Sequence, residues 1–506
     1  MVKRTAPTLL ALTGLVLLLV GPSQAAPGDL DPGFGKGGKV TTEGGAAFGV
    51  ALQPDGKIVA AGPRETDRDV LVFSVARYRR NGTLDPSFSS DGRQTTSIGE
   101  TSPAQDVAVD ADGRILVVGA TTASPSSPSR FALVRYLPDG SLDPAFGADG
   151  VVVTGFEPQS AEAFAISVQP DGKIVVAGSV RAPRSADYAF ALARYQADGS
   201  LDTSFGTQGR VITSFGIDSS IAKAVGQGPN GTIVLAGYRL RFTENEALEG
   251  LGFALARYTS EGELDDTFGL DGKVTTTFGG GGAASSLAIQ ADGQVVAAGT
   301  TSLEAGSNRN FALARYDVDG ALDPDFGVGG IVTTDFDSGD DVASGVVMTP
   351  DGKIVAAGTA QKDHPTFALA RYLPDGNLDP TFGKGGRVRT VFGDEGIDQA
   401  LSIAAQPDGK IVAAGISVDE NAARFALARY LDRQPLCIVP GVRRRPLAKA
   451  RRAIRRAHCS VGRIRHKVSS KVRKGRVIAQ HPRRGAHRVA GAKVKLVVSK
   501  GKRQRR

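Results

Sequence analysis

An arginine and an aspartate recur at a fixed spacing along most of this 506-residue chain. Because a charge repeated seven times is seldom one active site, we expect a structural hydrogen bond or ion pair in each repeat, with Asp379 serving Arg371 and Asp31 serving Arg429. The alternative is a ring of carboxylates that binds Ca²⁺, although the Asp-x-Asp-x-Asp-Gly spacing of calcium loops is absent. The recurring residues are Arg77, Arg135, Arg194, Arg257, Arg315, Arg371 and Arg429, with Asp31, Asp85, Asp143, Asp202, Asp265, Asp323 and Asp379.

Residues that could perform catalysis are few in this region. Residues 27–432 contain a single histidine, His364, and no cysteine, whereas a zinc site or a histidine-based triad needs several convergent groups. Most carboxylates occupy turn positions, where Asp bonds the local backbone. We therefore predict no catalytic residue, no metal and no cofactor, and a chain that is not an enzyme. Loops that interrupt the repeat, at 121–130 and 240–251, are the better candidates for specificity.

Short strands must position these residues. Each unit begins with Leu-Asp, contains an Asp-Gly or Asn-Gly hairpin turn and ends in a strand such as residues 367–372, where side chains alternate between two faces. Four strand-sized segments, repeated seven times, predict an all-β fold: a seven-bladed β-propeller of four-stranded blades over residues 27–432. An open solenoid of β-units is the alternative. The small residues of Ile-Val-Ala-Ala-Gly at 354–358 would permit close approach between blades.

The two ends of the array predict how the ring closes. The array starts with Leu30-Asp31-Pro32 and stops at Arg429-Tyr430, without the Leu-Asp continuation that follows Arg-Tyr elsewhere. We expect residues 29–42 to complete the last blade as its outer strand, so that the chain's start closes its end.

The repeats resemble the bacterial delta-60 repeat family. The similarity lies in Leu-Asp-x-x-Phe-Gly, as at 322–327, in Gln-Pro-Asp-Gly-Lys, as at 406–410, and in Phe-Ala-Leu-Ala-Arg-Tyr, as at 367–372. It covers all seven units. The resemblance implies a β-propeller in an exported or surface protein, and it implies no reaction.

Charge separates the C-terminal region from the repeats. Residues 433–506 contain 26 Lys and Arg and no acidic residue; subtracting these from the totals of 61 and 52 leaves residues 1–432 with 35 basic and 52 acidic residues. A strand near 437–440, an amphipathic helix near 447–457 and strands at 476–480 and 493–498 predict a small α/β domain over 436–501, followed by a basic tail, 502–506. Candidate polyanion-binding residues are Arg451, Arg452, Arg455, Arg456, Arg463 and Arg465.

This region resembles a PASTA domain, the module associated with penicillin-binding proteins and serine/threonine kinases. Arg444 stands where the family has glycine. The resemblance implies a small α/β fold and recognition of peptidoglycan or the cell wall. The similar residues are Val439, Pro440, Ala450, Gly462, Ser469, Lys474–Ile478, Gln480, Pro482, Gly485, Gly491, Val494 and Val498–Gly501.

The N-terminal residues predict an exported protein. Lys3 and Arg4 precede an apolar run at 9–20 and a small-x-small pattern at 23–25, which predicts a secretory signal peptide over 1–25; an uncleaved anchor is the alternative. Cys437 and Cys459, the two cysteines of the chain, would then form a disulfide, and two free thiols are the alternative.

Together these features predict a secreted, cell-wall-associated, non-enzymatic binding or scaffold protein. Its partners would be peptidoglycan or anionic wall polymers for the basic domain and a protein or glycan for the propeller. Nucleic acid is disfavoured because 433–506 has no aromatic residue for base stacking. The alternatives are a propeller hydrolase or lyase, which would need carboxylates of different blades about 5–10 Å apart, and a simple polyanion-binding adhesin. A further one is a basic domain that only adds solubility and docks on the acidic propeller.

Overall fold

The structure is a computed structural model that describes residues 25–124, 126–182, 187–216, 218–242, 248–302, 308–337, 339–393, 396–419, 422–432, 437–457, 459–488 and 492–502. The predicted signal peptide, apart from Ala25, and most of the basic tail lie outside these residues. Contacts divide the chain into a unit of Ala26–Arg433 and a C-terminal unit that begins at Gln434. No helix among the described residues is long and apolar enough to cross a membrane.

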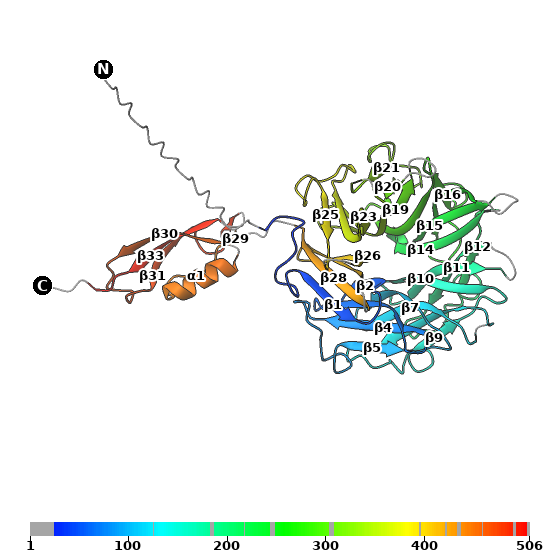
Figure 1. Cartoon of the computed structure of the whole chain (residues 1–506), viewed down its shortest axis with the longest axis horizontal. Helices are drawn as coiled ribbons and strands as arrows, with labels where there is room; N and C mark the ends of the chain where they lie inside the picture. The colour runs from blue at the N-terminus through cyan, green and yellow to red at the C-terminus, as the bar shows by residue number, and fades with distance from the viewer. Residues whose placement is uncertain are drawn as a thin grey trace, which may run out of the picture. The chain divides into compact units, whose positions relative to one another are not determined.

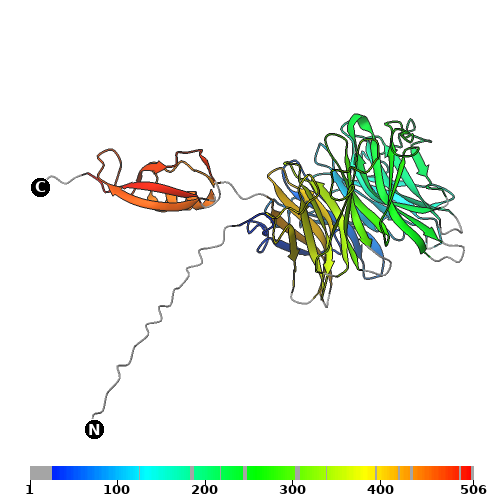
Figure 2. The same ribbon diagram turned by 90° about the horizontal axis from the view of Figure 1, so that it is seen from above.

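The first unit is a seven-bladed β-propeller, as the sequence predicted (Figures 1 and 2). Six blades each take four consecutive strands. The first blade contains β2 (Gly49–Leu52), β3 (Ile58–Glu65), β4 (Leu71–Tyr78) and β5 (Arg93–Thr96), and the second contains β6 (Ala104–Val109), β7 (Ile115–Thr121), β8 (Arg130–Tyr136) and β9 (Val151–Thr154). The third contains β10 (Ser160–Val168), β11 (Ile174–Arg181), β12 (Tyr188–Tyr195) and β13 (Arg210–Thr213), and the fourth contains β14 (Ser219–Gln227), β15 (Ile233–Phe242), β16 (Leu248–Tyr258) and β17 (Lys273–Thr277). The fifth contains β18 (Gly282–Ile289), β19 (Val295–Ser302), β20 (Arg309–Tyr316) and β21 (Ile331–Thr334), and the sixth contains β22 (Asp341–Met348), β23 (Ile354–Gln361), β24 (Pro365–Tyr372) and β25 (Arg387–Thr390). A short 3₁₀ turn, η1 (Pro229–Gly231), joins β14 to β15.

The seventh blade combines both ends of the propeller chain. Its strands are β26 (Ile397–Ala405), β27 (Lys410–Val418) and β28 (Ala423–Leu431), and β1 (Lys39–Glu43) pairs antiparallel with β28 as the outer strand. Figure 1 shows the blue β1 beside the orange β28. The predicted strand exchange is therefore confirmed, and because inner strand β2 also contacts β26 the sheets form a ring rather than an open solenoid.

Each pair of neighbouring blades shares its own apolar core. Between the fifth and sixth blades, for example, Val296, Phe311 and Leu313 pack against Ala356 and Ala368. A four-stranded sheet with two apolar faces can bury both only between two other sheets, which is why a closed ring suits this sequence.

A bulge in the inner strand explains the glycine of Ile-Val-Ala-Ala-Gly. The inner strands of six blades carry a register shift, as between Ala343 and Gly345 of β22. Opposite it lies Gly358, where a Cβ atom would overlap the carbonyl oxygen of Val342 in the same blade. The glycine therefore serves close approach inside a blade, and the expectation of blade-to-blade approach holds only for the alanines, such as Ala356 and Ala357, which lie in two different inter-blade cores.

The C-terminal unit is a helix packed on a three-stranded sheet. Helix α1 (Leu447–Arg456) covers one face of the sheet β30 (Ser460–Lys467), β33 (Lys493–Ser499), β31 (Val477–His481), and a two-stranded ladder joins β29 (Cys437–Ile438) to β32 (His487–Arg488). Ala450 and Ile454 of the helix are buried against Val494 and Leu496 of β33. Arg444 adopts a φ of 63°, so the turn keeps the left-handed conformation that glycine adopts most easily.

Candidate functional site

The recurring arginines and aspartates form one ion pair in every blade. Arg371 Nη2 lies 2.9 Å from Asp379 Oδ2, and Arg429 Nη2 lies 2.8 Å from Asp31 Oδ2 across the closure. Six of the seven pairs are buried, for example Arg371 and Asp379, which expose 1% and 2% of their side chains, whereas Arg257 and Asp265 expose 12% and 16%. The other pairs are Arg77–Asp85, Arg135–Asp143, Arg194–Asp202, Arg257–Asp265 and Arg315–Asp323.

Each arginine also joins its blade to the next one. The Arg194 guanidinium lies 4.2 Å from the centre of the Phe205 ring, and its Nη1 donates to the carbonyl oxygen of Ser260 in the following blade. Asp202 and Phe205 thus account for the Leu-Asp-x-x-Phe-Gly pattern, because both hold the same arginine. Every aspartate pairs with its own arginine, so this geometry is that of a blade-linking clamp.

Neighbouring donors and cations favour the ionised form of the clamp carboxylate Asp85. Burial raises the pKa of Asp85, but hydrogen bonds from Ser87 and Lys57 and the charge of Arg77 outweigh it and lower that pKa to about 2. Lys57 comes from the Pro-Asp-Gly-Lys turn, and its Nζ lies 3.2 Å from Asp85 Oδ2. Among the described residues no group of three or more His, Cys, Asp or Glu could hold a metal ion.

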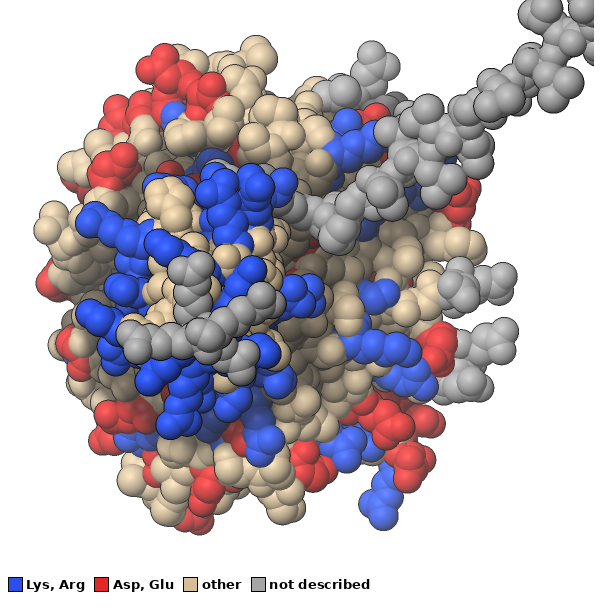
Figure 3. Space-filling view, turned by 90° about the vertical axis from the view of Figure 1, so that its left-hand side faces the viewer, with Lys and Arg blue, Asp and Glu red and all other residues tan. Residues whose placement is uncertain are grey.

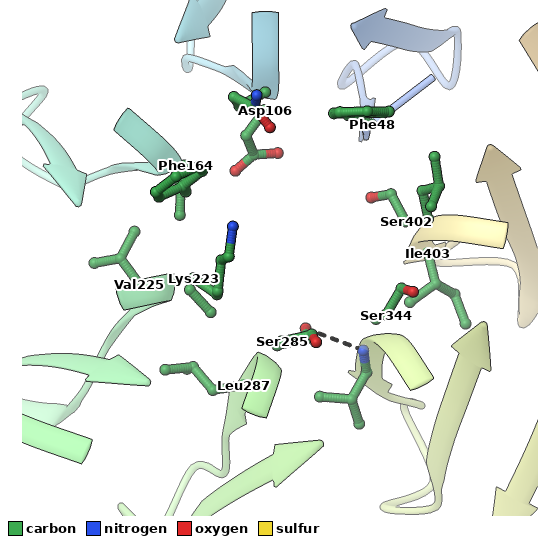
Figure 4. A pocket seen from close by; sticks show the side chains of 17 residues that line it. Phe48, Asp106, Phe164, Lys223, Val225, Ser285, Leu287, Ser344, Ser402 and Ile403 are labelled. Atoms are coloured by element: carbon green, nitrogen blue, oxygen red, sulfur yellow. Dashed lines mark hydrogen bonds between the residues drawn. The ribbon is translucent and has the colours of Figure 1, made fainter. Parts of the chain in front are cut away.

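The inner strands surround a cavity of about 340 Å³ at the hub of the propeller (Figure 4). Its wall is built from the bulges. In six inner strands the residue at the register shift interrupts the alternation of side chains between the two faces of the sheet, and it faces the cavity. In the first blade Phe48, just before β2, lines the cavity at the equivalent position. Bulges re-aim side chains in this way. The seven residues are Phe48, Gln105, Phe164, Lys223, Ser285, Ser344 and Leu401.

Asp106 is the carboxylate among the described residues that line this cavity. Its Oδ1 accepts a hydrogen bond from its neighbour Val107 N at 2.8 Å, and its Oδ2 accepts one from Ile166 N of the next blade at 3.1 Å. Burial raises the pKa of Asp106 to about 7, against the lowering effect of those two hydrogen bonds. This side chain is therefore substantially protonated at neutral pH.

Lys223 is the cation among the described residues that line the cavity. Its Nζ lies 3.6 Å from the centre of the Phe164 ring, a distance at which a cation is attracted to the ring face. Burial lowers the pKa of Lys223, and the charge of Glu162 opposes that shift. In Figure 4 the lysine and Asp106 both extend into the central space.

This cavity was missed by reasoning from the sequence, although a signal exists. Each unit contains an alanine followed by the bulge residue, as in Ala163-Phe164 and Ala222-Lys223. The alanine recurs in all seven units, whereas the next residue differs from blade to blade. The predicted specificity loop 240–251 lies largely in strands, since β15 extends to Phe242 and β16 begins at Leu248. Residues 243–247, and Pro125 of the other predicted loop, lie outside the described part.

The candidate polyanion-binding residues separate into two groups. Arg451, Arg452, Arg455 and Arg456 are exposed on α1, which covers one face of the sheet. Arg463 and Arg465 of β30 instead line a groove of about 300 Å³ on the open face of the sheet, together with Lys495 of β33 and His481 of β31. The C-terminal unit is the densely blue part of Figure 3.

The predicted disulfide stays a prediction. Cys459 is buried, with 5% of its surface exposed. The side chain of Cys437 lies outside the described part of the chain, so the structure does not describe the partner thiol.

Two family models match the chain. A domain of unknown function described as a DUF5122 β-propeller matches residues 53–88, 111–146, 169–205, 228–268, 290–326, 349–382 and 406–431, one segment in each repeat. A PASTA domain matches residues 438–500. A comparison with curated proteins found no match.

Similar solved structures are propellers of low sequence identity. The polysaccharide lyase Uly1 is 12% identical, with 81% of this chain and 98% of that chain covered and a TM-score of 0.43. A protein of unknown function from Dyadobacter fermentans is 12% identical, with 79% and 100% covered and a TM-score of 0.41. The α-L-arabinofuranosidase arb93a from Fusarium graminearum is 10% identical, with 80% and 98% covered and a TM-score of 0.39.

These similarities contradict one sequence-based prediction. We predicted that the chain is not an enzyme, whereas two of the three similar structures are carbohydrate-active enzymes. The prediction of a non-enzymatic chain therefore falls. At 10–12% identity the similarity concerns the fold and assigns no activity to this chain.

Proposed function

Because this chain is a DUF5122 β-propeller protein with a C-terminal PASTA domain, we propose that it is exported and held at the cell wall by that domain. The propeller would then be kept beside wall material, with its hub cavity open to small molecules. The ligand of the PASTA domain would be an anionic wall polymer or the acidic groups of peptidoglycan.

The open face of the C-terminal sheet carries this proposal. Arg463, Arg465 and Lys495 surround one groove there, and the domain contains no acidic residue to neutralise them. Long-range attraction from so many like charges raises the local concentration of a polyanion and speeds its association. The groove adds a place where sugar units can sit between the cations.

The test is binding of the full chain to purified cell wall. We expect sedimentation with the wall at low ionic strength and release by salt, because exposed charges are screened within about 8 Å at 0.15 M salt. The propeller alone, residues 26–433, should remain in solution. Equal sedimentation of the propeller alone would contradict the proposal.

Two variants of equal charge separate groove binding from general attraction. The double substitution Arg463→Gln/Arg465→Gln removes two cations from the groove, and Arg451→Gln/Arg455→Gln removes two from the helix. We expect the first to weaken wall binding about tenfold more than the second. Equal losses would support simple polyanion adhesion in place of a groove.

A further inference from the structure

The hub cavity breaks the sevenfold repetition of the propeller. Six inner strands carry a bulge, and they form it with side chains as different as Phe164, Lys223 and Ser285. Folding of the ring therefore does not explain their chemistry. An asymmetric wall gives a bound molecule one preferred orientation, which a ring of identical residues cannot do.

The charge of the residues that line the cavity indicates which class of molecule could bind there. Lys223 brings a cation to the cavity wall, where neighbouring side chains partly shield it from water. Asp106 opposes this charge only in part near neutral pH, because burial raises the pKa of its carboxyl to about 7. We propose that the hub cavity binds a small hydroxylated carboxylate, of the chemical class of the sugar acids, with its carboxylate paired to the Lys223 ammonium group.

The other lining residues suit the rest of such a ligand. Ser285 and Ser344 place hydroxyl groups on the side of the cavity away from Phe48 (Figure 4). Hydroxyls can both donate to and accept from sugar hydroxyls, and the Phe48 ring offers a flat apolar surface for the hydrogen-bearing face of a sugar ring. The cavity volume of about 340 Å³ falls in the range of small-molecule sites.

A phosphate ester fits the wall less well. Dianionic phosphates are commonly held by arginine forks, by several cations or by successive backbone N–H groups. The described lining offers one ammonium group, and no arginine is among those residues. One cation matches the single negative charge of a carboxylate.

The titratable groups around the cavity predict how binding depends on pH. Asp106 loses its proton as the pH rises through about 7, which adds a negative charge to the wall. Lys223, whose pKa burial lowers, begins to lose its charge earlier than a free lysine would. Glu162 is exposed, and its charge favours the ammonium form of Lys223. Anion affinity should therefore fall on going from pH 6 to pH 8.

Isothermal titration calorimetry with the unmodified chain tests the ligand class. The probes are D-glucuronate, D-glucose and inorganic phosphate, each at pH 6 and pH 8. We expect D-glucuronate to bind at least about tenfold more tightly than D-glucose or phosphate, and more weakly at pH 8. Equal binding of glucose, tighter binding of phosphate, or no binding of glucuronate would overturn the proposal.

Two substitutions locate the site. Lys223→Gln should lower the affinity for D-glucuronate at least about tenfold, whereas Lys36→Gln, the same change of charge at an exposed turn outside the cavity, should leave it unchanged. Lys223→Arg, which keeps the charge, should retain part of the binding. Unchanged affinity in a folded Lys223→Gln variant would refute the site, and the pH dependence of the unmodified chain gives an answer if that variant does not fold.

Discussion

The closure of the ring by residues 26–43 predicts an unusual local weakness. This segment completes the seventh blade without a covalent link to it: β1 pairs with β28 over five residues, and the Phe34 ring is fully buried between the seventh and first blades. The Arg429 guanidinium lies 4.6 Å from the centre of that ring. Substituting Phe34→Ala removes the apolar contact and the cation–π contact together.

A matched position shows what such a loss costs elsewhere. Phe326 is also 0% exposed, and the Arg315 guanidinium lies 4.6 Å from its ring centre. Truncation of a fully buried phenylalanine costs about 3–5 kcal/mol, and the cation–π contact adds about 1 kcal/mol. Both Phe34→Ala and Phe326→Ala should therefore lower the free energy of unfolding by about 4–6 kcal/mol.

The two variants should differ in how they open. Phe326 lies in chain that continues into strands on both sides, so its loss weakens the whole propeller. Among the described residues, the segment that contains Phe34 continues into further strands only at its C-terminal end, so it can leave the seventh blade while the other blades stay folded. The free energy of that local opening should fall in Phe34→Ala by about the same 4–6 kcal/mol.

Hydrogen exchange followed by mass spectrometry distinguishes these outcomes. In Phe34→Ala we expect the amides of Lys39–Glu43 to exchange well before those of an internal outer strand, Ile331–Thr334. In Phe326→Ala the two strands should keep the order of protection that they have in the unmodified chain. Full protection of Lys39–Glu43 in Phe34→Ala would refute the reasoning, because the closure would then not depend on this clamp.

Further predictions concern charge, backbone and sulfur. Because burial raises the pKa of Asp106 to about 7, the folded state keeps that proton to a higher pH than the unfolded chain does. The free energy of unfolding should therefore fall as the pH rises from about 4 to 7. Urea unfolding at pH 5 and pH 8 measures this fall, and Asp106→Asn should abolish it. Asp85, whose pKa is lowered to about 2, acts in the opposite sense: its contribution to the free energy of unfolding is present above about pH 4 and is lost toward pH 2. Asp85→Asn should therefore reduce the pH dependence of the free energy of unfolding between about pH 4 and pH 2. Arg444→Gly should stabilise the C-terminal domain by about 1 kcal/mol, seen as a higher unfolding temperature, because glycine adopts a φ of 63° without strain. If Cys437 and Cys459 are bonded, alkylation will change the mass of the denatured chain only after reduction, and reduction will cost about 3 kcal/mol of stability.

The sequence by itself determined the number of blades, the strands within each blade and the closure of the ring. These follow from local patterns: alternating side chains make strands, Asp-Gly turns join them, and a Leu-Asp start without its preceding Arg-Tyr leaves one blade to be completed by the other end of the chain. The recurring charges could also be predicted to be structural, because a charged residue at the same position of seven equivalent blades has the same surroundings in each blade.

Only the tertiary structure decided where the chemistry gathers. Lys223 and Asp106 are 117 positions apart in the sequence, and each looks like an ordinary strand residue in its own unit. A bulge is a mismatch between two paired strands, so it exists only once both strands are in register, and in six blades it turns one residue out of alternation toward the common axis. The physical reason is that alternation along a strand is a local property, whereas convergence on a hub needs all the blades in place.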